Sequence, residues 1–555
     1  MKKILCFIFV LVTSALTSAG QSLPVDSYNL EDLYRIKQLK GEIDPDISFS
    51  IRPLLFKSSS FDSLYSSHDS VGSNKPRVMR PDEWKILPFT WQNRFNTHHP
   101  YGWNDGAIFP AKGFQTFLTG GVYSESGRFT FQIKPEVVIA VNSPFEEFPN
   151  DHYSIIWKFY YNFYNRTDIP VRFGSDPKIR ILPGQSSVRY NYKKISAGIS
   201  TENLWWGPGM RNSLLMSNTA AGFLHFTLNT IRPVQTAIGS FEGQLIAGRL
   251  DGSGATPPDP THTHLSTVLY QPKPNDWRYI SGLVMTYQPK VLPGLFVGFA
   301  RTSQLYSKDL NSLGKYLPFF SSYNNNVIAE RPTNPDRYTS VFLRWLLSKS
   351  QAEIYFEYGH NNQLKSFTDF LKDPDDGRAY IFGMSKLFSL STRKDEGILA
   401  KLEFTQLSQT SPSAVLKNAQ SWYIDDYVTH GYTQMGEPLG AGAGPGAEVQ
   451  TLDVNWIKGI KSLGVRFERF VHNQDFFYYA YEPSKDYRRH WTDIGLELNG
   501  RWDHQRFIFN GGLNFTKSIN YGWYMDPVET AQYYRNGIDA SNMRINLGVT
   551  YRLDK

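Results

Sequence analysis

Apolar and polar residues alternate with a period of two along most of the chain, which is the pattern of a β-strand with one apolar face. In the final stretch, NMRINLGVTYRLDK, one face carries only apolar side chains, and the other carries Arg544 and Arg552. The stretches RFTFQIKPEVVIAV, AEIYFEYGHN and RFIFNGGLNFTK repeat the pattern, with charged or amide residues on the polar face. One such strand fits a sandwich as well as a barrel, because both bury one face and wet the other.

The connections between the expected strands separate these two folds. The pattern predicts eighteen strands, at residues 86–96, 114–124, 128–141, 153–164, 188–199, 222–232, 236–249, 278–288, 293–302, 338–347, 351–360, 378–390, 397–408, 449–457, 461–470, 491–500, 504–517 and 542–553. Short links such as KGIK and RWDH alternate with long ones, except that the stretch 165–187 falls on the short side and is expected to fold beneath the barrel. Alternating short turns and long loops indicate an outer-membrane β-barrel with its short turns in the periplasm.

The membrane decides which face of each strand carries the charge. Each unpaired backbone group in hydrocarbon costs several kcal/mol, so the strands must close on themselves. An arginine facing lipid at the midplane costs about 2–4 kcal/mol, so Arg544 and Arg552 are predicted to face the lumen. The predicted fold is therefore an all-β transmembrane antiparallel barrel over residues 86–555, with long extracellular loops.

The residues before the barrel divide into two predicted segments. Residues 1–19 have two lysines, an apolar run and small closing residues, which indicates a secretory signal peptide cleaved after Ala19. Residues 20–85 are expected in the periplasm and contain NLEDLYRIKQLKG, a short helix that Asn29 can cap and Gly41 can end. A helix this short is marginal alone, so it is expected to pack on something larger.

Composition narrows the functional classes. The single cysteine, Cys6, lies in the signal peptide, so the mature chain is predicted to lack disulfides and zinc–thiolate sites. A net charge of +7 without a Lys/Arg run makes nucleic acid an unlikely partner. Aromatic residues make up 15% of the chain while the mean hydropathy is only −0.40, which fits a barrel that alternates lipid-facing and lumen-facing residues.

Two long motifs carry a further signal. They are ISAGISTENLWWGPGMRNSLLMSNTAAGF at 195–223, which is the most specific, and HGYTQMGEPLGAGAGPGAE at 430–448; the leader LYRIKQLKGEID followed by SFSIRPL adds a weaker signal. Together these stretches resemble the Wzi family of capsule assembly proteins. The resemblance spans nearly the whole mature chain. It implies an outer-membrane barrel with a small periplasmic helical part, and a lectin-like role in holding capsular or exported polysaccharide at the cell surface.

Aromatic and cationic residues in the long loops are the candidate polysaccharide contacts. Trp205 and Trp206 could stack on sugar rings, although the turn residues that follow them favour a structural role. Arg211 could bind an acidic sugar or neutralise lumen carboxylates, and the sequence does not separate these alternatives. The full candidate set is Trp205, Trp206, Arg211, Trp422, Tyr423, Tyr481, Tyr487, Arg488 and Arg489.

The last four of these residues lie in the loop 471–490, where aromatic rings beside cations suit an acidic polysaccharide. An interface girdle with a loop core is an equally good interpretation of that loop. His98 and His99 are adjacent, but no ligand set at useful spacing follows, so no metal site is predicted. Asp425 and Asp426 resemble a glycosidase pair, but neighbouring loop carboxylates are usually solvated.

Three functions remain in competition. The leading hypothesis is a non-enzymatic outer-membrane protein that binds polysaccharide, with no catalytic residue, cofactor or metal. A porin-like channel is the alternative, because an eighteen-strand barrel is wide enough for water. An outer-membrane hydrolase ranks last, since no motif nominates a catalytic set. The expected partners are outer-membrane lipids and polysaccharide; contact with export machinery is left open, and a monomer is expected.

Overall fold

The computed structural model describes most of the chain. The described residues are 21–25, 30–56, 83–316, 335–361, 371, 375, 377–390, 395–409, 421–481, 490–524 and 539–553. The predicted signal peptide and the predicted capping residue Asn29 lie outside them. The predicted segment boundaries, at residues 19 and 85, therefore stay predictions.

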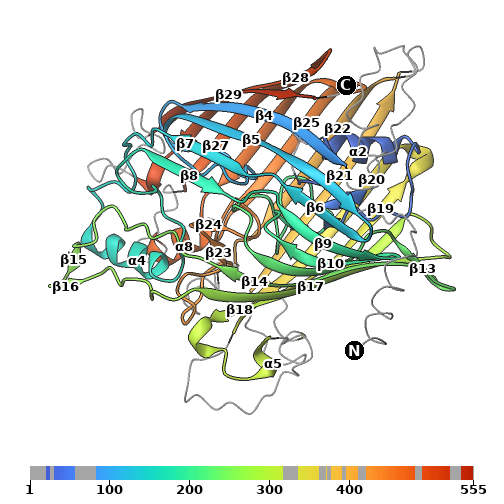
Figure 1. Cartoon of the computed structure of the whole chain (residues 1–555). Helices are drawn as coiled ribbons and strands as arrows, with labels where there is room; N and C mark the ends of the chain where they lie inside the picture. Colours follow the sequence, from blue (N-terminus) through green and yellow to red (C-terminus); the bar gives the residue numbers. More distant parts are fainter. Residues whose placement is uncertain are drawn as a thin grey trace.

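Within the described residues, antiparallel strands close into one barrel of eighteen strands (Figure 1). Three of these strands are each built from two consecutive segments, β6–β7, β8–β9 and β12–β13. The wall segments are β4 (Trp84–Asn96), β5 (Gly113–Ser126), β6 (Phe129–Ile133), β7 (Glu136–Ala140), β8 (Lys178–Leu182), β9 (Ser187–Tyr192), β10 (Ile195–Ser200), β12 (His225–Thr230), β13 (Val234–Gln235), β14 (Gly239–Leu250), β17 (Arg278–Pro289), β18 (Leu295–Tyr306), β19 (Asp336–Leu347), β20 (Ala352–Asn361), β21 (Arg378–Ser389), β22 (Glu396–Gln406), β25 (Glu448–Lys458), β26 (Lys461–Val471), β27 (Thr492–His504), β28 (Phe507–Ile519) and β29 (Ala540–Tyr551).

Smaller elements lie inside the barrel or at its ends. The short strands are β1 (Gln21–Leu23), β2 (Ile51–Arg52), β3 (Leu54–Phe56), β11 (Trp205–Trp206), β15 (Thr263–His264), β16 (Thr267–Val268), β23 (Thr433–Gln434) and β24 (Glu437–Pro438). The helices are α2 (Glu31–Leu39), α4 (Ser154–Tyr164), α5 (Leu313–Tyr316), α8 (Gln474–Tyr481) and the 3₁₀ turns η2 (Ser307–Asp309), η4 (Ser348–Ser350) and η7 (Tyr521–Trp523). No helix of the described part of the chain is long and apolar enough to cross a membrane.

The barrel closes where β29 pairs with β4, with Thr550 opposite Thr90. Leu547 on β29 is 60% exposed on the outside, whereas Arg544 is 5% exposed and faces inward. Arg544 binds the carboxylate of Glu497 at 3.2 Å, and the buried Arg552 binds Asp503. The predicted inward direction of both arginines is confirmed.

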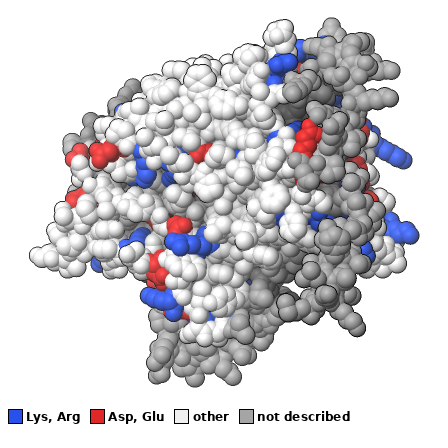
Figure 2. Space-filling model, viewed as in Figure 1, with Lys and Arg blue, Asp and Glu red and all other residues white. Residues whose placement is uncertain are grey.

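The outer face of the wall is apolar. Exposed Phe, Trp, Leu, Ile and Val side chains alternate with buried polar ones along the strands, as the burial pattern of β4 illustrates. On the face that Figure 2 shows, the wall is largely free of charged side chains, which gather mainly toward its margins. Such a surface matches acyl chains, because no polar group has to be taken out of water.

Three predictions between residues 141 and 200 are wrong. The stretch 153–164 is the helix α4 instead of a strand, and its buried residues Ile156, Trp157, Tyr161 and Tyr164 recur at helical intervals. The predicted strand 188–199 is a tight hairpin of β9 and β10. The missing wall segment is β8, which pairs with β7 and lies within the stretch 165–187 that was expected to fold beneath the barrel. With α4 in a long connection, short turns and long loops alternate without exception, and the count of eighteen holds.

The predicted N-terminal helix is α2, and it lies in the barrel mouth at the end of the short turns (Figure 1). Ile36 and Leu39 pack on inward-facing side chains of the wall, among them Phe296 and Leu346. Leu33 packs near Ile508, which follows a short turn. The helix therefore occupies the short-turn end of the lumen, while α4 and α8 lie together at the long-loop end (Figure 1).

Candidate functional site

Three loops from the long-loop end fold back into the lumen. We call residues 99–111, 201–224 and 421–447 together the loop plug. Their apolar side chains join the inward faces of the wall in one buried core, which includes Trp206, Leu214, Tyr338, Phe342 and Tyr355. The interior of this part of the barrel is thus packed like a protein core, and is not a water-filled pore.

The two predicted sugar-stacking indoles belong to this core. Trp206 is fully buried, and its Nε1 donates a hydrogen bond to Oε1 of Gln244 at 2.8 Å. Trp205 is 3% exposed, and the guanidinium of Arg52 lies over its ring at 4.4 Å. Their strand β11 pairs with β2 of the N-terminal segment. Both indoles therefore have structural partners, and their predicted contact with sugar stays a prediction.

The Gly-Pro-Gly turn after these indoles wraps around a wall carboxylate. Glu403 on β22 accepts hydrogen bonds from three successive backbone N–H groups, those of Met210, Arg211 and Asn212, at 2.7–3.0 Å. A Cβ at Gly209 would clash with the carbonyl oxygen of Asn212, so the turn needs glycine there. The most specific motif of the sequence is therefore explained by an anchor nearly two hundred residues away.

Arg211 neutralises a lumen carboxylate, which is one of the two alternatives that the sequence left open. Its Nε lies 2.8 Å from Oε2 of Glu468 on β26. Its guanidinium also lies over the ring of Trp103 at 3.9 Å. The pKa of the buried Tyr101 hydroxyl, which donates to the same carboxylate, is raised well above its usual value by burial and by the charge of Glu468.

Trp422 and Tyr423 are likewise fully buried in the plug. Nε1 of Trp422 donates to the carbonyl of Gly377 at 3.0 Å, and the Tyr423 hydroxyl donates to the carbonyl of Leu214 at 2.8 Å. A Cβ at Gly440 would clash with that same carbonyl of Leu214. The glycine-rich motif thus serves the close approach of two plug loops.

Charged side chains hold the N-terminal segment in the lumen. Arg35 of α2 and Arg344 of β19 share the buried carboxylate of Glu353, at 2.9 and 2.6 Å. Asp32 of α2 pairs with Arg501 of β27 at 3.0 Å. Burial would raise the pKa of Asp32, but the charges of Arg501 and Lys401 and the hydrogen bond from Arg501 outweigh it, so the pKa lies below its usual value.

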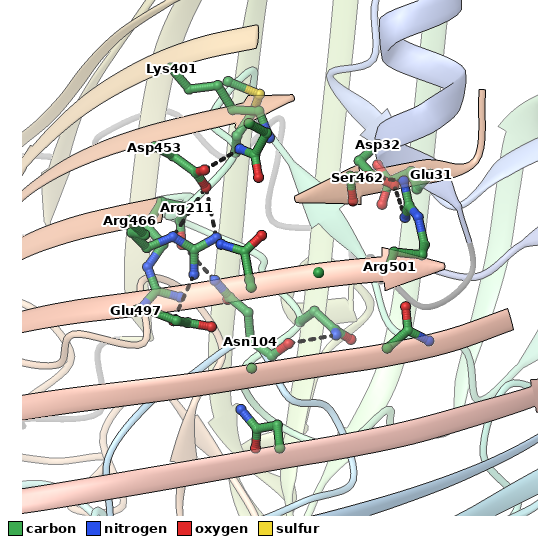
Figure 3. Close-up of a pocket in the computed structure, with 18 of the residues that line it drawn as sticks. Glu31, Asp32, Asn104, Arg211, Lys401, Asp453, Ser462, Arg466, Glu497 and Arg501 are labelled. Atoms are coloured by element: carbon green, nitrogen blue, oxygen red, sulfur yellow. Dashed lines mark hydrogen bonds and ion pairs between the residues drawn. The ribbon is translucent and has the colours of Figure 1, made fainter. Parts of the chain in front are cut away.

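A chamber of about 300 Å³ remains between α2 and the loop plug (Figure 3). Asn104 and Arg211 border it on the plug side and Glu31 and Asp32 on the helix side, while its strand wall runs from β22 across β25–β29. Figure 3 shows Asp453 bound to Arg466 on this wall, and Arg501 bound to Asp32. The chamber is polar, and its charges are mostly paired.

Aromatic residues gather at the long-loop end in what we call the aromatic lobe: α4, α8, η7 and the hairpin β15–β16 with Leu269 and Tyr270 after it. Their rings form one buried cluster around Trp157, Phe476 and Trp523. Tyr481 is 1% exposed inside this cluster, so the ring that was predicted to contact sugar is part of its core. Tyr487, Arg488 and Arg489 lie outside the described residues.

The half-buried edge of the lobe was missed by the sequence reasoning. Phe159 of α4 and Tyr479 of α8 meet edge to face with ring centroids 4.7 Å apart. Nδ2 of Asn162 donates to the Tyr479 hydroxyl at 2.8 Å, which fixes that ring. The helical spacing of buried aromatics in 153–164 is the signal that could have placed Phe159 and Asn162 on one helix.

Electrostatics in the long-loop region favour neutral forms. Burial lowers the pKa of the Lys273 ammonium to about 7, and its Nζ donates to the carbonyl of Tyr164 at 2.7 Å. Burial likewise lowers the pKa of His99 to about 4, while Asp493 opposes the shift. The Nδ1 atoms of His98 and His99 lie 3.0 Å apart. No group of three or more possible metal ligands occurs among the residues that the structure describes.

Comparison with known proteins identifies the family. The family model of the capsule assembly protein Wzi matches residues 104–511. The chain belongs to the Wzi family. The solved structure of Wzi of Escherichia coli, an outer membrane protein involved in group 1 capsule assembly and a carbohydrate-binding β-barrel, is 15% identical to this chain. The match covers 96% of this chain and 100% of that chain, with a TM-score of 0.58. This Wzi-family chain is accordingly an outer-membrane β-barrel.

More distant structures share only a barrel. OccAB2 of Acinetobacter baumannii is 9% identical over 85% of this chain and 99% of that chain, with a TM-score of 0.39. OprD of Pseudomonas aeruginosa is 9% identical over 85% of this chain and 93% of that chain, with a TM-score of 0.36. No curated protein matches the chain.

Proposed function

We propose that this Wzi-family protein binds capsular or exported polysaccharide at the cell surface and helps to assemble or retain it there. The observation that carries the proposal is the aromatic lobe, whose edge presents Phe159, Asn162 and Tyr479 at the end of the long loops. In outer-membrane barrels this end is extracellular. Aromatic faces stack on the apolar faces of sugar rings, and an amide beside them can bond to hydroxyls.

The filled lumen supports binding over transport. The loop plug packs against the wall from β14 to β26, and α2 occupies the opposite mouth. A porin needs a continuous aqueous path, and here both ends of the lumen hold folded chain. The outer surface of the long loops is then the part of the molecule that an exported polymer meets first.

An enzyme is the weaker proposal. Ser154 at the start of α4 has its Oγ 2.8 Å from Nδ1 of His264, a contact on the exposed surface. The neighbouring carboxylate of Asp259 binds His262 instead, and no described residue orients His264 as a catalytic base. A Ser/His/Asp set requires that third member, so we propose binding without catalysis.

Cell-surface retention of capsule tests the proposal. In a strain that lacks the gene we expect polymer to be made but shed into the medium, and the wild-type gene should restore retention. A double variant Phe159→Ala with Tyr479→Ala should restore it at most weakly. The matched control is Phe129→Ala with Tyr190→Ala, which removes a similar edge-to-face pair, with centroids 5.2 Å apart, next to the short turn between β9 and β10.

Binding of the purified capsule to purified protein separates the possible outcomes. Weaker binding by the lobe variant alone supports the lobe as the contact. Equal binding by both variants would show that the polysaccharide binds at the remaining loops and not at the aromatic lobe. Tyr487, Arg488 and Arg489 are the predicted contacts there. If the gene deletion left retention unchanged, the proposed function itself would be wrong. Contact with export machinery and a monomeric state stay predictions.

A further inference from the structure

The luminal chamber is lined by an ordered row of amides that the proposed surface function does not use. Cross-strand pairing places Asn455, Gly464, Asn499, Gly512 and Asn546 side by side on β25 to β29. Glycine thus separates each amide from the next, and all but Gly464 line the chamber. The Asn455 amide fills the space over Gly464, whereas Gly512 leaves room beside the chamber between Glu497 and Asn546.

Two amides near this wall have unused donors. Among the described residues, Nδ2 of Asn499 and Nδ2 of Asn510 donate no hydrogen bond and are shielded from solvent. By contrast, Oδ1 of Asn546 accepts from Nε of Arg94 at 3.0 Å. Buried amide donors are nearly always satisfied in folded proteins, so each of these groups is available to an acceptor once its side chain turns toward the chamber.

The neighbouring row supplies charge. It runs Lys401, Asp453, Arg466, Glu497 on β22, β25, β26 and β27. Arg466 binds both carboxylates, at 2.9 and 3.3 Å. Lys401 lines the same chamber, and its charge acts on Asp32 and Asp453, although no ion pair within 4 Å joins it to a described carboxylate. Among the described residues, the chamber thus offers a cation without a close ion pair beside a wall of amides.

We propose that this chamber is a second binding site, which takes one carboxylate-bearing sugar residue, such as a hexuronate. Lys401 binds its carboxylate, and the amides of the row bind its hydroxyls. The volume of about 300 Å³ is at the lower limit for ligand sites, which suits a single sugar residue but not a folded polymer. The site lies on the lumen side of the plug and is independent of the aromatic lobe.

Calorimetry on the full-length protein in detergent tests the chamber. The probes are galacturonate, galactose and acetate, each titrated separately. We expect galacturonate to bind, galactose to bind at least tenfold more weakly because it lacks the carboxylate, and acetate to give no heat because it lacks the hydroxyls.

Two variants of different kinds locate the site. Lys401→Gln should weaken galacturonate at least tenfold and leave galactose unchanged. Gly512→Leu adds bulk where a Cβ would meet Glu497 and Asn546 at 3.3–3.8 Å, so it should extend into the chamber and abolish binding. Lys290→Gln changes an exposed lysine after β17 and should bind like wild type.

The results distinguish this site from the surface site. Heat-dependent migration on gels verifies that each variant keeps a folded barrel. The lobe variant Phe159→Ala with Tyr479→Ala should bind galacturonate as wild type does, even where it loses capsule. The inference is wrong if wild type gives no heat with galacturonate, if acetate binds as well as galacturonate, or if Lys401→Gln and Gly512→Leu both bind normally.

Discussion

The two ends of the barrel are closed by different kinds of interaction. At the long-loop end, the loop plug inserts aromatic and aliphatic side chains into a core that it shares with the wall. At the short-turn end, α2 adds a smaller apolar contact and is fastened by buried ion pairs, above all by Arg35 with Glu353. One end is therefore closed mainly by packing, and the other largely by charge.

This difference follows from what each segment meets. Near the long-loop end, the wall has apolar inward-facing residues such as Ile280 and Val284 on β17, so a loop that enters there can bury apolar surface. Near the short-turn end, the inward face of the wall carries Arg344, Glu353 and Arg501. A segment that enters there must supply the opposite charges. A buried ion pair adds little to the free energy of unfolding, but removing one partner is costly. Such pairs therefore fix where the N-terminal segment lies more than they stabilise the fold.

The largest effect is expected from Trp206→Ala in the plug. Loss of a fully buried indole leaves a cavity and removes the donor to Oε1 of Gln244, which together cost about 3–5 kcal/mol. Denaturant unfolding measures the total, and limited proteolysis of the folded barrel shows whether residues 201–224 become accessible. Trp502→Ala is the control, because Trp502 is 52% exposed on the outer face. Equal protease resistance of both variants would contradict a packed plug.

The next effect is expected from Glu353→Gln at the other end. The change leaves Arg35 and Arg344 sharing a neutral amide in a buried site, at a cost of about 3 kcal/mol. The N-terminal segment should become sensitive to protease while residues 201–224 stay protected. Asp251→Asn is the control: it loses an ion pair with Arg249 in which both side chains are about half exposed, and should cost at most about 1 kcal/mol. Release of both segments together would show that the two closures are not independent.

The wall was predictable from the sequence because its strands obey one rule. An alternation such as that around Arg544 fixes a strand, its lipid face and its lumen face at once. The rule fails in 153–164, where aromatic and β-branched residues suggested a strand and only their helical spacing indicated α4. The prediction counted the helix α4 as a strand and counted the hairpin of β9 and β10 as one strand. These two errors compensated, so the predicted count of eighteen was still correct.

The plug and its contacts were not predictable in the same way. Trp205 and Trp206 look like sugar-stacking residues in the sequence, because nothing near them reveals that Arg52 and Gln244 hold them inside the lumen. The same holds for Arg211, whose partner Glu468 lies on a strand 257 residues further along the chain. When the barrel closes, residues far apart in the sequence meet across the lumen. The alternation along one strand does not tell which residues on other strands or loops it will contact.

The smallest effect is expected from acid, which should loosen the long-loop end at a higher pH than the short-turn end. His99 of the plug has its pKa lowered by burial to about 4, from an unfolded value of 6.5. Between those values the unfolded chain binds more protons, so this group's contribution to stability is complete above pH 6.5 and is lost as the pH falls toward 4. At pH 5 the loss is about 2 kcal/mol. Asp32 of α2 has a lowered pKa, so its pairing with Arg501 persists at pH 5 and is lost only below its unfolded value of 3.8.

Proteolysis at pH 7 and at pH 5 measures this separation in one protein. We expect the plug to become more accessible at pH 5 while the N-terminal segment stays protected. His99→Gln should remove only part of the change, because burial also lowers the pKa of His430 in the same plug to about 4. Lowering the pH below 3.8 should then release α2 as well. If the N-terminal segment opened first, at pH 5, the charge-fastened end would be the more acid-sensitive one, and the assignment of packing and charge to the two ends would have to be reversed.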